Sequence, residues 1–162
     1  ISSISVKSAE KIKKYRSNNR LFFFKEDASK INRWEKKISK YIKEKKTVFF
    51  FWFLLHEIST NKKSVIIKYL KNIRKKFPNS QIVICELTKQ SDKVFKMNSE
   101  KSLMPEYLLF HDFSGQGVLS FSDYKDIISK TGYSIKKEWL FDRNDTNSNE
   151  PSEPSTFVWI LQ

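Results

Sequence analysis

Mainly apolar stretches alternate with amphipathic stretches along this chain of 162 residues. Their length and their aromatic and β-branched side chains predict buried strands. Buried strands are expected at 21–24, 48–55 and 81–87, and further strands at 1–5, 133–141 and 156–161. Apolar residues at helical spacing predict amphipathic helices between the strands. These helices are expected at 6–15, 31–42 and 65–73.

Three local signals place helix ends. Residues 59–61 (Ser-Thr-Asn) offer N-caps for the helix at 65–73, and Ser120 with Asp123 resembles a capping box that opens a helix through Lys130. Gly132 stands where a C-cap glycine belongs. Strands that alternate with helices and end in a closing pair predict an open α/β sheet, mostly parallel.

Two histidines follow apolar segments, and each is followed by an acid. His56 and Glu57 come after the run 48–55, expected to be a central strand covered on both faces, and His111 and Asp112 come after the segment 107–110. Ligands of open α/β sheets bind beyond the carboxyl ends of the strands, so we expect both pairs to face a cleft there. Alternatively, His56 merely caps the next helix and His111 is a polar residue flanking a helix.

Composition narrows the class of protein. Hydrophobic residues make up 39% and charged residues 30%, which is typical of a globular chain. No apolar run approaches the ~20 residues of a membrane-spanning helix, so no membrane partner is expected. The single cysteine, Cys85, excludes an internal disulfide and fits a reducing, cytoplasmic location. The net charge of +13 fits a nucleic-acid surface or solvated lysine-rich helix faces, and we favour the second interpretation.

Several segments carry a resemblance to a known family. The run "FWFLLHEISTNKKSVIIKYLKNIRKKFPNSQIVICEL" resembles the fourth and fifth strand region of S-adenosylmethionine-dependent methyltransferases, more narrowly the small-molecule type related to plant O-methyltransferases. The segment "MPEYLLFHDFSGQGVLSFSDYKDIISKTGYSIKKEWLF" fits the region that follows, and "TFVWILQ" looks like the family's antiparallel last strand. "ISSISVKSAEKIKKY" and "RLFFFKEDASKI" resemble the second and third strands. The resemblance implies a Rossmann-like class I methyltransferase sheet, mostly parallel with an antiparallel C-terminal strand.

The resemblance also implies S-adenosylmethionine as cofactor. Asp27 and Ala28 would lie beside its adenine, and Ser3 falls where the family places the ribose-binding acid. The family's first strand carries a glycine-rich loop, but the three glycines of this chain all lie at 115–132. We therefore interpret residues 1–162 as the C-terminal part of a methyltransferase domain. The first strand and any dimerisation domain would lie outside the chain. The chain would need this missing part, and the whole protein could form a homodimer.

The resemblance implies two roles for the histidines. In O-methyltransferases a histidine at the position of His56 is a general base toward a substrate hydroxyl. A subgroup that methylates the β-carbon of 2-oxo acids holds a metal ion with two histidines, here His56 and His111, and the ion would be iron or zinc. Glu57 would orient His56 or accept the substrate proton, and Asp112 and Gln116 would contact the substrate.

Three functions follow from these patterns. We favour the metal-dependent C-methyltransferase over the metal-free O-methyltransferase. A third hypothesis is a degenerate, non-catalytic basic module that binds RNA or a protein partner. The expected partner in the first two cases is a small molecule, a 2-oxo acid or a hydroxyl compound, and not a nucleic acid.

Overall fold

The computed structural model describes these residues: 26–39, 41–42, 47–59, 62–92, 94, 96, 104–115, 117–141 and 153–162. The chain divides into two compact units, 1–43 and 44–162. In the first unit the described element is helix α2 (Ile31–Ile38), which confirms the start of the helix predicted at 31–42 but ends earlier. The strands predicted at 1–5 and 21–24 and the helix predicted at 6–15 lie outside the described residues.

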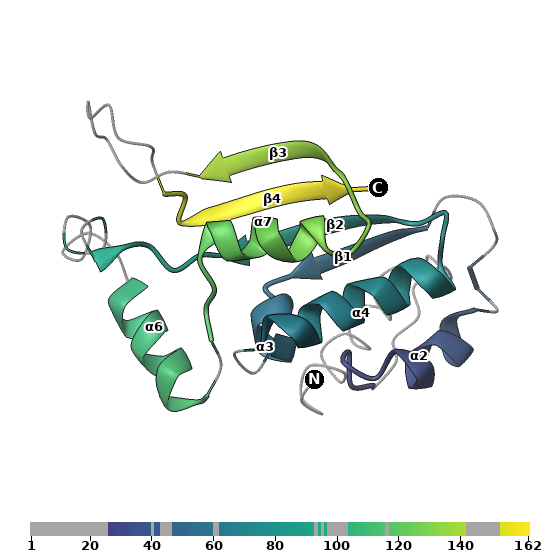
Figure 1. The fold of residues 1–162 in the computed structure, drawn as a ribbon. Helices are drawn as coiled ribbons and strands as arrows, with labels where there is room; N and C mark the ends of the chain where they lie inside the picture. The colour runs from purple at the N-terminus through teal and green to yellow at the C-terminus, as the bar shows by residue number, and fades with distance from the viewer. Residues whose placement is uncertain are drawn as a thin grey trace, which may run out of the picture. The chain divides into compact units, whose positions relative to one another are not determined.

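The second unit is built on a four-stranded sheet in the order β1-β2-β4-β3 (Figure 1). Its strands are β1 (Val48–Trp52), β2 (Gln81–Leu87), β3 (Ile135–Phe141) and β4 (Thr156–Leu161). β1 and β2 are parallel, whereas β4 is antiparallel to both β2 and β3. The α/β fold and the antiparallel last strand are thus confirmed, with a single parallel pair among the described strands.

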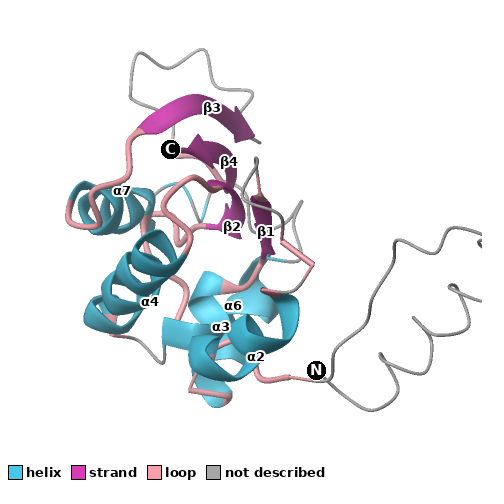
Figure 2. Ribbon diagram, turned by 90° about the vertical axis from the view of Figure 1, so that its right-hand side faces the viewer, coloured by secondary structure: helices cyan, strands magenta, loops and turns pink. Residues whose placement is uncertain are grey.

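Four helices accompany this sheet among the described residues of the second unit: α3 (Leu55–Ser59), α4 (Lys63–Lys76), α6 (Met104–Phe113) and α7 (Phe121–Ser129). Helices α4 and α7 cover one face of the sheet (Figure 2). Tyr69 of α4 packs on Phe51 of β1 with ring centroids 5.8 Å apart, and Tyr124 of α7 packs on Phe157 of β4 at 5.1 Å. No helix among the described residues is long and apolar enough to cross a bilayer.

Strand β1 is not the doubly covered central strand that its sequence suggested. Phe49 and Phe51 face the helices, since their rings contact Phe77 and Tyr69. Phe50 and Trp52 are 70% and 65% exposed, because successive side chains of a strand point to opposite faces. The most buried of the described strands is β2, which lies between β1 and β4.

The strand predicted over 48–55 also ends early, at Trp52. Phe53 adopts a φ of 49°, a left-handed conformation that a bulky residue rarely takes, and its N–H donates to the carbonyl of Cys85 at 2.9 Å. The chain then turns into α3. His56 is therefore the second residue of a short helix and not the residue that follows a strand.

The other helix signals had mixed outcomes. Helix α4 begins after Lys62, whose side chain makes no cap, and Ser59 is instead the last residue of α3. The apolar segment 107–110 is part of helix α6. The capping box of Ser120 and Asp123 is confirmed. Gly132 has the positive φ, 81°, expected after a helix.

Replacing Ser120 with alanine should lower the free energy of unfolding by about 1 kcal/mol, the usual cost of losing an N-cap. The reason is that its hydroxyl oxygen accepts a hydrogen bond from the N–H of Asp123 at 3.2 Å. A urea denaturation curve measures the change. Ser129→Ala is the matched control, because that hydroxyl donates to the carbonyl of Asp126 in the last turn of the same helix. Equal stability of the two variants would contradict the prediction.

Candidate functional site

The site begins where the parallel strands β1 and β2 end side by side. Glu86, near the end of β2, is fully buried, and one of its carboxylate oxygens accepts a hydrogen bond from the backbone N–H of Leu55 at 2.6 Å. The other oxygen lies 2.7 Å from Nδ1 of His56. Because Glu86 holds both the first helical N–H of α3 and the imidazole, it fixes where His56 lies.

The buried pair of His56 and Glu86 determines which nitrogen of the imidazole carries the proton. Burial by itself lowers the pKa of His56, but the hydrogen bond and charge of Glu86, with a contribution from Glu57, raise it above its usual value. Burial raises the pKa of the Glu86 carboxyl, against the hydrogen bonds from His56 and Leu55. A carboxylate that accepts two hydrogen bonds requires a proton on Nδ1, so Nε2 of neutral His56 carries a lone pair.

In His111, as in His56, the Nδ1 atom of the imidazole donates a hydrogen bond. His111 lies in α6, and its Nδ1 donates to the carbonyl of Tyr107 one turn earlier, at 2.8 Å. In the neutral ring this leaves the lone pair on Nε2. The rings of His111 and His56 lie 5.1 Å apart between centroids. The structure thus brings together the two histidines of the chain, between which helix α4 and strand β2 lie in the sequence.

Glu57 completes a group of three possible metal ligands. One of its carboxylate oxygens lies 3.4 Å from Nε2 of His56, and its side chain is 44% exposed. One ligand atom from each of His56, Glu57 and His111 lies within 4.8 Å of the others. Within the part of the chain that the structure describes, this group alone combines three such side chains at that spacing.

Tyr107 contacts both histidines. Its hydroxyl lies 3.2 Å from Nε2 of His56, and its ring centroid lies 3.8 Å from that of His111. Burial, followed by the charges of Glu86 and Glu57, raises the pKa of Tyr107 to about 12. The phenol is therefore protonated near neutral pH, and toward neutral His56 with its proton on Nδ1 it donates a hydrogen bond to Nε2.

The described structure does not test the remaining predicted site residues. Ser3 and Gln116 lie outside the described residues, as does the side chain of Asp112. Asp27 and Ala28 belong to the first unit, where the carbonyl of Ala28 accepts a hydrogen bond from the indole of Trp34 at 2.9 Å. Their roles stay predictions.

Sequence reasoning missed Glu86 and Tyr107. Glu86 had a signal, because an acid inside the otherwise apolar strand "QIVICEL" must be paired when buried. Tyr107 had none until its segment was known to be a helix. On a helix, residues four apart share a face, so Tyr107 then falls beside His111.

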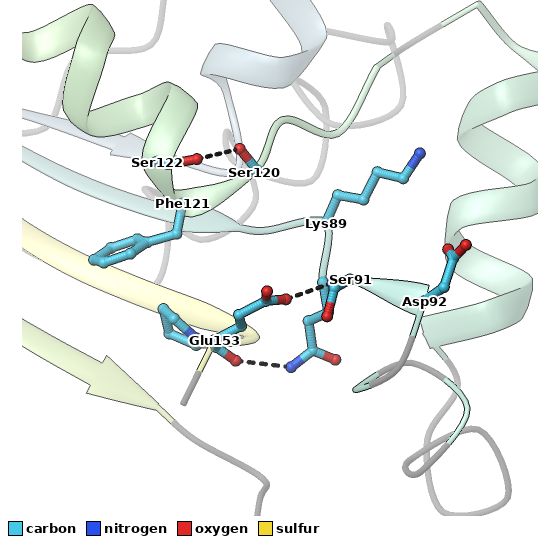
Figure 3. Close-up of a pocket in the computed structure, with 9 residues that line it drawn as sticks. Lys89, Ser91, Asp92, Ser120, Phe121, Ser122 and Glu153 are labelled. Carbon is cyan, nitrogen blue, oxygen red and sulfur yellow. Dashed lines mark hydrogen bonds between the residues drawn. The ribbon is translucent and has the colours of Figure 1, made fainter. Parts of the chain in front are cut away.

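A separate hollow of about 550 Å³ lies where β2 leaves the sheet and β4 enters it (Figure 3). Lys89, Ser120 and Phe121 are among its lining residues. Glu153 also lines it; its carboxylate accepts the N–H of Ser91, and its carbonyl accepts the side-chain amide of Gln90. None of the site residues predicted from the sequence lines this hollow.

Comparisons with known proteins found similarity among solved structures. No protein-family model matches the chain, and no curated protein matches it. A SAM-dependent methyltransferase from Leishmania major is similar with a TM-score of 0.43 and 11% identity over 71% of this chain and 37% of that one. The methyltransferase CalO6 is similar with a TM-score of 0.40 and 10% identity over 71% of this chain and 34% of that one. The chain therefore spans little more than a third of either structure.

Proposed function

We propose that this chain is the metal- and substrate-binding part of an S-adenosylmethionine-dependent methyltransferase that methylates the β-carbon of a 2-oxo acid. The observation that carries the proposal is the group of His56, Glu57 and His111, whose ligand atoms lie within 4.8 Å of one another. The reaction class comes from the sequence resemblance, in which two histidines at these positions hold a metal ion.

The donor set fits iron or zinc. Both Nδ1 atoms are engaged, by Glu86 and by the carbonyl of Tyr107, so two Nε2 atoms remain for a metal. Imidazole nitrogen and carboxylate oxygen are ligands of zinc and of non-haem iron. A buried carboxylate on the far nitrogen of a ligating histidine orients the ring and raises its basicity. Two imidazoles leave several coordination positions open for a chelating substrate and water.

Each residue of the group has a part in activating the substrate. A bound metal ion would act as a Lewis acid on the keto and carboxylate oxygens of the 2-oxo acid and so acidify the β-carbon. His56 and His111 would hold the ion, and Glu86 keeps the His56 ring in place. Glu57, half exposed beside them, would accept the proton that leaves the β-carbon. The electron pair of that C–H bond then stays with the substrate, whose β-carbon becomes the nucleophile.

The described residues do not form a cradle for S-adenosylmethionine. The three glycines of the chain come late, and a Cβ built on Gly115 would meet nothing within 4 Å, so that glycine does not serve a close approach. Asp27 and Ala28, the predicted adenine neighbours, lie in the other unit. We therefore derive no step through the methyl donor and assign to this chain the metal and substrate side of the reaction.

One observation favours a second candidate, the metal-free O-methyltransferase. The pairing of His56 with the buried Glu86 raises the pKa of the imidazole, as a general base requires. In that case His56 would take the proton of a substrate hydroxyl, and His111 would serve only to pack against Tyr107. The two candidates differ in whether His111 and a metal ion are needed.

The test begins with elemental analysis of the purified chain, followed by calorimetric titration of Fe(II) and Zn(II) into chelator-treated protein. We expect a single ion per chain. Absence of binding would overturn the metal proposal and leave the O-methyltransferase in its place. Transfer of a labelled methyl group from S-adenosylmethionine to 2-oxo acids is then measured with the product of the whole reading frame. Failure of both assays would favour the non-catalytic basic module.

Replacing Glu57 with glutamine should lower metal affinity or methyl transfer about tenfold, the lower end of the usual ~10–100-fold cost of losing a carboxylate beside a metal ligand. The glutamine side chain has the size of the glutamate, but it carries no charge and does not accept a proton. Calorimetry and the transfer assay measure the two effects. Glu106→Gln, an exposed acid in the first turn of α6, is the matched control. A Glu57→Gln protein with full affinity and activity would remove Glu57 from the mechanism.

The remaining expectations are untested and stay part of the proposal. These are the cytoplasmic location, the small-molecule partner, and the need for a missing part of the methyltransferase domain.

A further inference from the structure

The hydroxyl of Tyr107 is hydrogen-bonded to Nε2 of His56, the atom that a metal ion would need. Nδ1 of His56 is committed to Glu86, so the lone pair of Nε2 is the one that would bind metal, and the Tyr107 hydroxyl donates to that lone pair at 3.2 Å. An Nε2 lone pair cannot serve both a phenol and an ion. The hydroxyl must therefore give up this hydrogen bond when the ion binds.

The ring of Tyr107 is held in place by its contacts with His111. It packs on His111 at 3.8 Å between centroids with planes 35° apart, and its backbone carbonyl holds Nδ1 of the same histidine. These contacts keep the hydroxyl close to His56. Ligands around one ion at ~2.0–2.1 Å lie roughly 3 Å from each other, so the hydroxyl would lie within reach of whatever atom binds next to Nε2.

From this geometry we infer that Tyr107 is a substrate-contacting residue that passes its hydrogen bond from His56 in the metal-free site to an oxygen of the chelating 2-oxo acid in the loaded site. The inference rests on the proposed function. It assigns Tyr107 two opposite effects. Its hydroxyl competes with the metal for His56, and it then selects a ligand that offers an oxygen lone pair beside His56.

The experiment compares the wild-type chain with Tyr107→Phe, which removes only the hydroxyl. Zn(II) is titrated into both apo proteins by calorimetry, and pyruvate is then titrated into the zinc-loaded proteins. We expect zinc to bind the variant as tightly as the wild type or up to several-fold more tightly, and pyruvate to bind about two- to tenfold more weakly, as the loss of one hydrogen bond implies. Tyr133→Phe is the control, because that ring packs under Arg74, away from the site, and should change neither affinity.

Each outcome decides the inference. Equal pyruvate affinity of the zinc-loaded wild type and Tyr107→Phe would overturn it while leaving the metal proposal intact. A visible phenolate charge-transfer band on loading the wild type with Fe(III), lost in Tyr107→Phe, would also overturn it, because Tyr107 would then be a ligand and not a donor. Absence of zinc binding by the wild type would overturn the proposed function and this inference with it.

Discussion

We expect His111→Ala to abolish the proposed binding of zinc and iron by this chain, and His56→Ala to do the same. Each change removes one of two imidazoles whose ring centroids lie 5.1 Å apart and whose ligand atoms lie within 4.8 Å of each other. The expected loss of affinity is at least about 100-fold, since losing only an outer hydrogen-bond partner of a ligand costs ~10–100-fold. Calorimetric titration of Zn(II) into the apo proteins measures the loss, and circular dichroism verifies that the variants are folded.

The matched control for this prediction is Phe110→Ala. It truncates an exposed aromatic residue next to His111 in the same helix, with ring centroids 6.0 Å apart, and leaves both imidazoles in place. Zinc affinity should then stay that of the wild type. The general-base alternative predicts that only His56 matters strongly for activity and that a chelator has no effect. A His111→Ala protein that binds zinc as tightly as the wild type would contradict the proposed metal site.

Local signals in the sequence predicted much of the fold of the second unit. The capping box at Ser120 is a short-range signal, because the groups that satisfy each other lie three residues apart. Strands β2 and β4 were found because their apolar runs have the length and β-branched content of strands. Such signals depend on neighbouring residues and survive in the folded protein.

The end of β1 could not be found in this way. Residues 48–55 are all apolar, so nothing in the run distinguishes the strand from the turn and helix that follow it. The strand ends because Phe53 takes a left-handed conformation and because Glu86, 31 positions further along, binds the N–H of Leu55. A contact of that range is invisible to any local pattern. The same ambiguity hid helix α6 in the run "YLLF".

In the candidate site, too, some residues could be found from the sequence and others only from tertiary contacts. His56 and His111 could be named from the sequence because each stands beside an acid after an apolar segment. Glu86 and Tyr107 owe their places to the pairing of β2 with β1 and to the packing of α6 beside α3. The sequence thus singled out the two histidines that the structure brings together, whereas the tertiary structure determines which residues hold them in place.

Glu86→Gln should weaken both the fold and the metal site. The Glu86 carboxylate accepts from Leu55 and from His56, whereas a glutamine has one oxygen and would turn its amide N–H groups toward one of these donors. Leaving a buried donor without its acceptor costs ~1–3 kcal/mol, and we expect about 3 kcal/mol because the lost acceptor is a charged carboxylate. The midpoint of urea unfolding of the metal-free protein measures this loss.

The same variant should bind zinc up to about 100-fold more weakly, because the His56 ring loses the carboxylate that orients it and raises its basicity. Glu138→Gln is the matched control: its oxygen accepts the indole N–H of Trp159 at 2.7 Å, a role that an amide oxygen can keep. The two losses separate the possible roles of Glu86. Lower stability with unchanged zinc affinity would make Glu86 a structural partner of α3 alone. A loss of both stability and zinc affinity would mean that the carboxylate of Glu86, which binds the start of α3, also positions His56.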